Sequence, residues 1–234
     1  MENLIELNKF LEKEEPEFIL KYFLEKYGDR AGLSSSFSME DQVITNMLVS
    51  VNQRPKIFTL DTGRLPYETY KLIDTTRERY NIDIEIYFPD YKKVESMVKE
   101  KGVNLFYNSV DDRKLCCNIR KDEPLKRALT GLDVWITGLR KEQSVTRGGL
   151  NIVEYDEGFK IIKINPLLNW SEKQVWDYIK KYDVPYNQLY KQNYRSIGCA
   201  PCTRAVKPGG NIRDGRWWWE NPETKECGLH LKIK

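Results

Sequence analysis

The 234-residue chain has a single histidine, and it contains no uninterrupted apolar run of eighteen residues. Without such a run, the sequence predicts no membrane-spanning helix. Its N-terminus also lacks the basic start and apolar stretch of a secretory signal. We therefore expect a cytoplasmic protein with no membrane partner.

The net charge of the chain is also small. The 38 Lys and Arg residues nearly balance the 35 Asp and Glu residues, which leaves a formal charge of +3. A charge this small does not predict binding to nucleic acid through the overall field of the protein. Any site for an anion must therefore be a local feature of the fold.

The chain has only five cysteines, and their arrangement does not suggest the disulfide framework of a small secreted domain. They form an adjacent pair, a Cys-x-x-Cys pair and a lone residue near the end: Cys116-Cys117, Cys199 with Cys202, and Cys227. This grouping favours a metal site built from four thiolates, with one separate thiol.

Neither repeats nor a Pro/Gly/Ser-rich linker divides the chain, which predicts one domain. After helices at roughly 2–12 and 16–27, apolar strand patterns alternate with helical ones, and this alternation predicts a parallel sheet. The expected strands are 31–37, 55–60, 82–88 and 133–139, with a hairpin at 151–166; the expected helices are 39–49, 66–80, 91–100, 113–129 and 171–182. Regular periodicity fades beyond residue 183.

Three polar segments follow predicted strands: "SSSFSMED", "LDTGRLP" and "TGLRKEQSVTR". Loops at the carboxyl ends of parallel strands should meet in one crevice. The first places four serines ahead of a helix N-terminus, where backbone N–H groups can bind phosphate or sulfate. Taken alone, that segment favours an ordinary serine-rich helix cap.

Two pairs of arginines strengthen the case for an anion site. Arg140 and Arg147 flank the third loop, and Arg213 and Arg216 lie beside three consecutive tryptophans. Guanidinium groups suit phosphate and sulfate oxygens, although any one of these arginines could be an ordinary surface residue.

Four thiolates suit either zinc or an iron-sulfur cluster. Structural zinc sites usually separate paired ligands by two or more residues, whereas a larger cluster offers metal corners farther apart. From spacing alone the two remain equal alternatives, and buried structural thiols are a third.

Several motifs occur together in one order along the chain: "SSFSMEDQV", "LDTGRLPYETY", "CCNIRKDEPLKRAL", "TGLRKEQSVTR", "IGCAPCTRAV", "GRWWWE" and "KECGLH". Over nearly its whole length the chain resembles the assimilatory adenylyl-sulfate reductases of the PAPS/APS reductase family. The resemblance implies a Rossmann-like α/β fold of the adenine nucleotide alpha hydrolase type, with a mostly parallel sheet flanked by helices. We expect a domain at 1–215 and a mobile C-terminal tail at 216–234.

The resemblance also implies a [4Fe-4S] cluster, and it identifies a cysteine nucleophile. The implied cluster ligands are Cys116, Cys117, Cys199 and Cys202, and the nucleophile is Cys227. Its thiolate would attack the sulfur of adenosine 5'-phosphosulfate, release AMP and form an S-sulfocysteine. Thioredoxin or glutaredoxin would then release sulfite. By this resemblance, the reaction would belong to sulfate assimilation and cysteine biosynthesis.

Other site residues follow from the same motifs. Lys121 should lie between cluster and substrate, with Arg213 and Arg216 at the sulfate end. The expected substrate-binding set is Ser36, Phe37, Ser38, Leu60, Asp61, Thr62, Gly63, Gly138, Arg140 and Arg147. We hypothesise that His230 positions or deprotonates Cys227; the alternative is that it only packs the tail. Gly209 and Gly210 suggest a hinge that would move the tryptophan segment and the tail.

Three alternatives remain at this stage. The substrate could be the 3'-phosphorylated nucleotide, phosphoadenylyl sulfate. The chain could be an ATP pyrophosphatase of the same fold, although its serine loop lacks the glycines expected for pyrophosphate. It could also be a zinc-stabilised binding module. A homo-oligomer is compatible with each.

Overall fold

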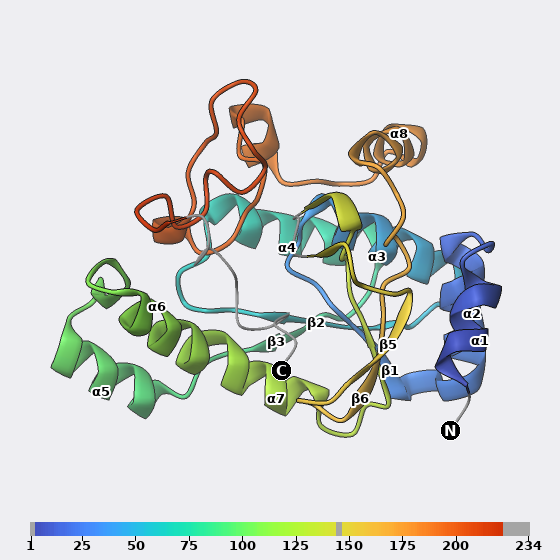
Figure 1. Ribbon diagram of the computed structural model, residues 1–234, viewed down its shortest axis with the longest axis horizontal. Coiled ribbons are helices and arrows are strands. Elements are labelled where there is room, and N and C mark those ends of the chain that lie inside the picture. Colours follow the sequence, from blue (N-terminus) through green and yellow to red (C-terminus); the bar gives the residue numbers. More distant parts are fainter. Residues whose placement is uncertain (1–2, 144–146, 222–234) are drawn as a thin grey trace.

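The computed structural model describes residues 3–143 and 147–221. Its helices and strands alternate as predicted (Figure 1). The helices are α1 Leu4–Leu11, α2 Pro16–Tyr27, α3 Met39–Val51, α4 Tyr67–Tyr80, α5 Tyr91–Lys101, α6 Val110–Cys117, α7 Glu123–Leu129 and α8 Glu172–Tyr182. The strands are β1 Ala31–Ser34, β2 Lys56–Leu60, β3 Glu85–Tyr87, β4 Val134–Ile136, β5 Val153–Asp156 and β6 Ile161–Ile164.

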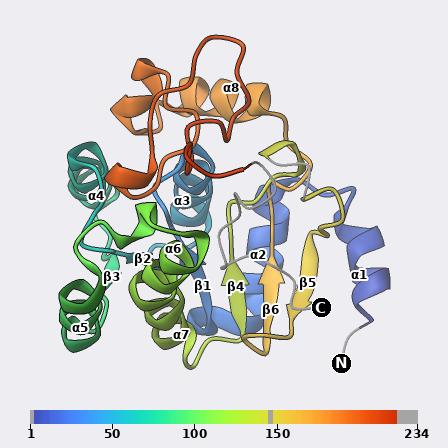
Figure 2. The ribbon, with the colours of Figure 1, turned by 60° about the vertical axis from the view of Figure 1, so that its left-hand side comes forward.

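The strands form one six-stranded sheet in the order β3-β2-β1-β4-β6-β5 (Figure 2). All neighbours are parallel except β5 and β6, which form the predicted antiparallel hairpin. The chain moves from β1 outward through β2 to β3, then returns to place β4 on the other side of β1. The order therefore reverses between β1 and β4, where an open α/β sheet normally binds its ligand.

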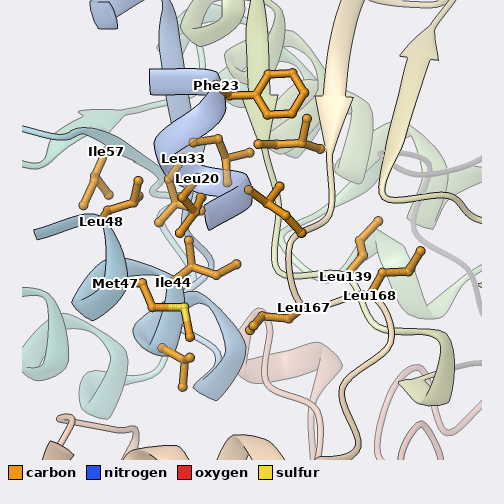
Figure 3. Close-up of a cluster of buried hydrophobic side chains, with 14 of the residues drawn as sticks. Leu20, Phe23, Leu33, Ile44, Met47, Leu48, Ile57, Leu139, Leu167 and Leu168 are labelled. Atoms are coloured by element: carbon orange, nitrogen blue, oxygen red, sulfur yellow. The ribbon is translucent and has the colours of Figure 1, made fainter. Parts of the chain in front are cut away.

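Alternating side chains along the strands build a separate core on each face of the sheet. On one face, Leu33 and Ile57 pack with apolar residues of α2 and α3, as Figure 3 shows. On the other, Phe58 and Trp135 pack with Leu125 and other residues of α7. Burial on both faces explains why these short strands read as apolar runs in the sequence.

The segment 113–129, predicted as one helix, contains a π-helix. Regular α-helix ends at Cys117, the π-helical turn covers Asn118–Asp122, and α7 begins at Glu123. A π-helical turn bonds residue i to i+5, so it rotates the following residues relative to an α-helix. The local break falls directly after the cysteine pair and includes Arg120 and Lys121.

Helix α8 begins with the predicted capping box, in which Ser171 and Gln174 each bond the other's backbone N–H. Within the described ranges, none of the helices combines the length and apolar character needed to cross a bilayer.

Candidate active site

A cavity opens at the carboxyl ends of β1, β2 and β4, and it draws lining residues from all three polar loops. This confirms the predicted convergence of the loops at the switch in strand order. Ten of the residues expected from the sequence line it: Ser36, Ser38, Leu60, Thr62, Lys121, Gly138, Arg140, Arg147, Arg213 and Arg216.

The serine loop enters helix α3 through a buried turn. Phe37 has a φ of 59°, a conformation that is uncommon for a bulky residue, and its ring is almost wholly buried. Ser38 is the N-cap of α3. Phe37 therefore fixes the loop from behind, in the core, while its neighbours Ser36 and Ser38 line the cavity.

Asp41 holds this loop in place. Its Oδ2 accepts hydrogen bonds from both the backbone N–H and the hydroxyl of Ser36, each 2.7 Å long. A Cβ on Gly138 would lie 2.3 Å from Asp41 Oδ1, so only glycine lets the loop after β4 approach so closely. The two loops that flank the strand-order switch thus meet at one buried carboxyl group.

Burial raises the pKa of Asp41 to about 6, and the neighbouring Glu40 carboxylate acts in the same direction. The hydrogen bonds from Ser36 and Ser38 oppose this shift without cancelling it. The folded protein therefore binds a proton at Asp41 between about pH 4 and 6, where an unfolded chain would already have released it.

The free energy of unfolding should therefore depend on pH through the titration of Asp41. Because the folded-state pKa is the higher one, the contribution of Asp41 falls as pH rises from about 4 to about 6. Replacing Asp41 by Asn should stabilise the protein at pH 7.5, relative to its effect at pH 4.5, by about 2 kcal/mol. Urea denaturation at the two pH values measures the difference.

Asp177→Asn is the matched control, because Asp177 is an exposed partner of Lys173 on α8. An exposed pair contributes no more than about 1 kcal/mol. If Asp41→Asn and Asp177→Asn gave the same pH dependence, the proposed titration of Asp41 would be wrong.

The loop after β2 is organised by Asp61. Its Oδ1 accepts hydrogen bonds from the N–H of Gly63 (2.7 Å) and the hydroxyl of Tyr70 (2.8 Å). Leu60 and Thr62 line the cavity, whereas Asp61 and Gly63 are not among the lining residues. Asp61 thus shapes the loop from behind.

Arg140 is buried in a network of its own. Its Nε is 2.9 Å from Glu40 Oε1, with both side chains nearly inaccessible, and its Nη1 contacts Glu142 and the carbonyl oxygen of Trp170. Much of its charge is therefore compensated within the protein. Arg147 lines the same cavity and donates to Gln143.

Three of the four described cysteines share one apolar cluster. Cys116, Cys199 and Cys202 pack with Trp217 and with residues of α5 and the turn before α6. Burial raises the pKa of Cys116 and of Cys202, and the neighbouring Cys199 acts in the same direction. Two distant parts of the chain thus bring their thiols together.

Basic side chains surround these thiols. Burial by itself raises the pKa of Cys199, but Lys121, a hydrogen bond with Thr62 and the two arginines Arg216 and Arg120 together lower it below its usual value. The Thr62 Oγ1 to Cys199 Sγ distance is 3.3 Å. Arg120 also hydrogen-bonds Cys116 and opposes the rise that burial causes in its pKa.

Burial raises the pKa of Cys202 to about 12, against the attraction of Arg216 and Lys121.

Among residues 3–143 and 147–221, no three His, Cys, Asp or Glu side chains form a group that could hold one metal ion. A single zinc ion needs every thiolate within about 2.3 Å of it, whereas the thiolates of an iron-sulfur cluster bind different irons.

Trp217 organises the second pair of arginines. Arg216 lies 4.7 Å and Arg213 5.6 Å from the centroid of its ring, within the range of cation–π attraction. Trp217 has a φ of 40°, and its side chain is buried against the cysteines. Both arginines line the cavity, so the anion crevice and the thiol cluster adjoin each other.

Arg195 and Tyr190 are among the cavity residues that the sequence motifs did not indicate. Arg195 lies at the cavity in an ion pair of 2.6 Å with Glu172 of α8. The Tyr190 hydroxyl accepts a hydrogen bond from the backbone N–H of Met39, the first residue of α3. Neither belongs to a regular pattern, and only the return of the chain after α8 brings them here. Cys227 and His230 lie outside the described residues.

Fold and site together define a nucleotide- or anion-binding α/β protein whose crevice adjoins a thiol cluster. The family model "Phosphoadenosine phosphosulfate reductase domain" matches residues 30–205. The chain belongs to this family of reductases.

Named relatives agree. The chain is 51% identical to an adenosine 5'-phosphosulfate reductase of Burkholderia cepacia, over 87% of this chain and 81% of that protein. It is 52% identical to one of Allochromatium vinosum, over 87% of this chain and 80% of the relative. It is 44% identical to the chloroplastic 5'-adenylylsulfate reductase 3 of Arabidopsis thaliana, over 98% of this chain and 52% of that protein.

Solved structures place the fold in the same group. A phosphoadenylyl-sulfate reductase of Candida auris in complex with phosphate superposes with a TM-score of 0.76 and 30% identity, covering 88% of this chain and 97% of that one. A Candida glabrata FMN adenylyltransferase superposes with a TM-score of 0.59 at 13% identity, covering 100% and 81%, and so shares the fold alone. The predicted fold class is confirmed.

Proposed function

We propose that this chain reduces adenosine 5'-phosphosulfate to sulfite and AMP by way of an S-sulfocysteine on Cys227. The observation that carries the proposal is the cationic crevice beside buried thiols, in a chain about 50% identical to named adenosine 5'-phosphosulfate reductases. An anionic thiolate must approach an anionic substrate, so positive groups are needed on both sides of the reacting sulfur.

In the first step, the thiolate of Cys227 forms a bond to the substrate sulfur, and the sulfur–oxygen bond to the phosphate breaks. AMP leaves with that electron pair. Arg213 and Arg216 bind the sulfate end, and Lys121 lies between the cluster and the substrate. The loop of Ser36, Phe37 and Ser38 binds the phosphosulfate. The loop of Leu60, Asp61, Thr62 and Gly63 lies beside the nucleoside, and Gly138 and Arg140 complete that wall. Arg147 is the remaining substrate-binding residue.

In the second step, a dithiol protein such as thioredoxin or glutaredoxin attacks the S-sulfocysteine. Its disulfide forms, sulfite leaves, and Cys227 returns to the thiol, so the dithiol supplies both electrons. The nucleophile belongs to a C-terminal segment, 216–234, that follows the domain at 1–215. The reductant, the cytoplasmic location, a homo-oligomeric state and a role of His230 toward Cys227 stay predictions.

The four remaining cysteines fit a [4Fe-4S] cluster. They come from two sites in the chain, three of them share one apolar pocket, and cations surround them. Positive neighbours lower the pKa of Cys199, whereas burial raises the pKa of Cys116 and of Cys202, so binding of the cluster would release protons from those two thiols. When bound, the cluster would supply a fixed local charge and a structural tie between the two sites. Cys116, Cys117, Cys199 and Cys202 would hold it.

A direct test is to incubate the protein, purified without oxygen, with adenosine 5'-phosphosulfate and no reductant. We expect one equivalent of AMP and one sulfite-equivalent adduct, located on Cys227 by intact mass and peptide mapping. An adduct on another cysteine, or none, contradicts the mechanism. Repeating the reaction with phosphoadenylyl sulfate tests the second candidate substrate, which the Candida auris likeness favours. Faster adduct formation with that nucleotide would reverse our assignment.

A further inference from the structure

A buried ion pair joins helix α6 to the segment that follows Trp217. Arg113 Nε lies 2.9 Å from Glu220 Oε1, and Arg113 Nη2 lies 2.9 Å from Glu220 Oε2. The two side chains are 1% and 3% exposed. A fork with two parallel hydrogen bonds fixes direction as well as distance, which a single contact does not.

The same guanidinium reaches both parts of the site. Its centre lies 4.7 Å from the centroid of the Trp217 ring, the ring against which Arg213 and Arg216 also lie. Arg113 also hydrogen-bonds Cys117, four residues farther along α6. One side chain therefore connects the cysteine pair, the aromatic ring beside the anion-binding arginines, and Glu220.

Aromatic contacts hold this segment independently of the ion pair. The ring of Trp219 lies 4.4 Å from that of Tyr107, and 6.1 Å from that of Phe106. Tyr107 in turn donates a hydrogen bond to the carbonyl oxygen of Pro201, between Cys199 and Cys202. Losing the charge of Glu220 should therefore leave the tryptophans packed. It should change only the direction in which the chain leaves Glu220.

Stability alone is a weak explanation for this pair. Removing two charges from water is costly, and a well-packed apolar pair of similar volume is often as stable. What an apolar pair lacks is a defined direction. Cys227 follows Glu220 by only seven residues, which span at most about 25 Å of chain. The position of Glu220 thus limits the volume that the Cys227 thiol can reach.

We propose that Arg113 and Glu220 form a tail anchor, a positioning pair that sets where the Cys227-bearing segment leaves the body of the protein and so aligns its thiol with the substrate sulfur. The inference rests on the proposed function. The pair acts on the approach of the nucleophile and not on binding of the nucleotide, because neither Arg113 nor Glu220 is among the residues that line the cavity.

The test separates these two effects. In Glu220→Gln the side chain keeps its size and loses its charge. We expect single-turnover formation of the Cys227 adduct, at saturating adenosine 5'-phosphosulfate, to slow at least tenfold. The dissociation constant for AMP, measured by calorimetry, should stay within about twofold of the unsubstituted protein. Glu220→Asp keeps the charge but shortens the side chain, so its rate of adduct formation should lie between the rates of the unsubstituted protein and Glu220→Gln.

Glu157→Gln is the matched control, because Glu157 pairs with Lys160 on the exposed β5–β6 turn, and its rate should not change. Thermal unfolding and the visible absorption of the cluster verify that each variant is intact. If Glu220→Gln does not fold, Glu220→Asp alone decides: an unchanged rate overturns the anchor.

Two outcomes contradict the anchor specifically. The first is an unchanged adduct rate in Glu220→Gln, in a preparation whose unsubstituted protein forms the adduct. The second is a loss of AMP affinity in proportion to rate, which would make the pair part of the nucleotide site. By contrast, failure of the unsubstituted protein to form any adduct would reject the proposed function.

Discussion

Replacing Cys227 by serine should abolish sulfite release while nucleotide binding remains. A serine hydroxyl is far less nucleophilic and far less acidic than a thiol, so the rate should fall by about 10⁴-fold or more, to background. AMP affinity should change less than about twofold, since the described residues that line the cavity already supply its polar and charged contacts. Sulfite formed with thioredoxin and calorimetric titration with AMP measure the two quantities.

The matched comparison is Cys202→Ser, at a cysteine that the proposal assigns to the cluster. That variant should lose the visible absorption of the cluster, whereas Cys227→Ser should retain it. If Cys227→Ser still released sulfite at a tenth of the original rate or more, the nucleophile would have to be a different residue.

The second large effect is expected at Arg216. Its side chain is buried, its Nε contacts the carbonyl oxygen of Cys202, and it lines the cavity. Replacing it by Lys keeps a positive charge but removes the planar fork that fits sulfate oxygens. We expect adduct formation to slow 10²- to 10³-fold, or about 3–4 kcal/mol, the usual effect of losing one preorganised donor.

A substitution at a neighbouring glycine tests the same contact while Arg216 itself is kept. A Cβ on Gly198 would lie 2.5 Å from Arg216 Nη2 and 2.7 Å from its Cζ, so Gly198→Ala must displace the guanidinium. This variant should reproduce much of the effect of Arg216→Lys. Gly149→Ala is the control, because its added Cβ meets nothing within 4 Å. A fully active Gly198→Ala would argue against Arg216 as the sulfate contact.

Regular elements were predictable where local periodicity and tertiary packing agree. The capping box of α8 and the apolar runs of β1, β2 and β4 are local signals, and each appears in the structure. The π-helix was not predictable, because the segment has an ordinary helical pattern. Arg120, within that turn, donates to the carbonyl oxygen of Thr62 and contacts Cys116. Tertiary contacts of this kind are not encoded by periodicity.

The site was predictable in its membership but not in its internal connections. The three loops converge as the parallel pattern requires, since carboxyl ends of parallel strands share one edge. The sequence did not indicate that Asp41 would accept both donors of Ser36, or that Glu40 would partner Arg140. Arg195 and Tyr190 lie in a stretch without periodicity, and no local signal marks them.

By itself, the sequence determined the α/β alternation, the grouping of the cysteines and the motifs that identify the family, because these are properties of residue type and spacing along the chain. Only the tertiary structure decided which charges are compensated: Arg140 by Glu40, Arg195 by Glu172 and Arg113 by Glu220. The pairing of these charges depends on distances between side chains that can be a hundred positions apart in the sequence. Burial then sets the strength of each ion pair.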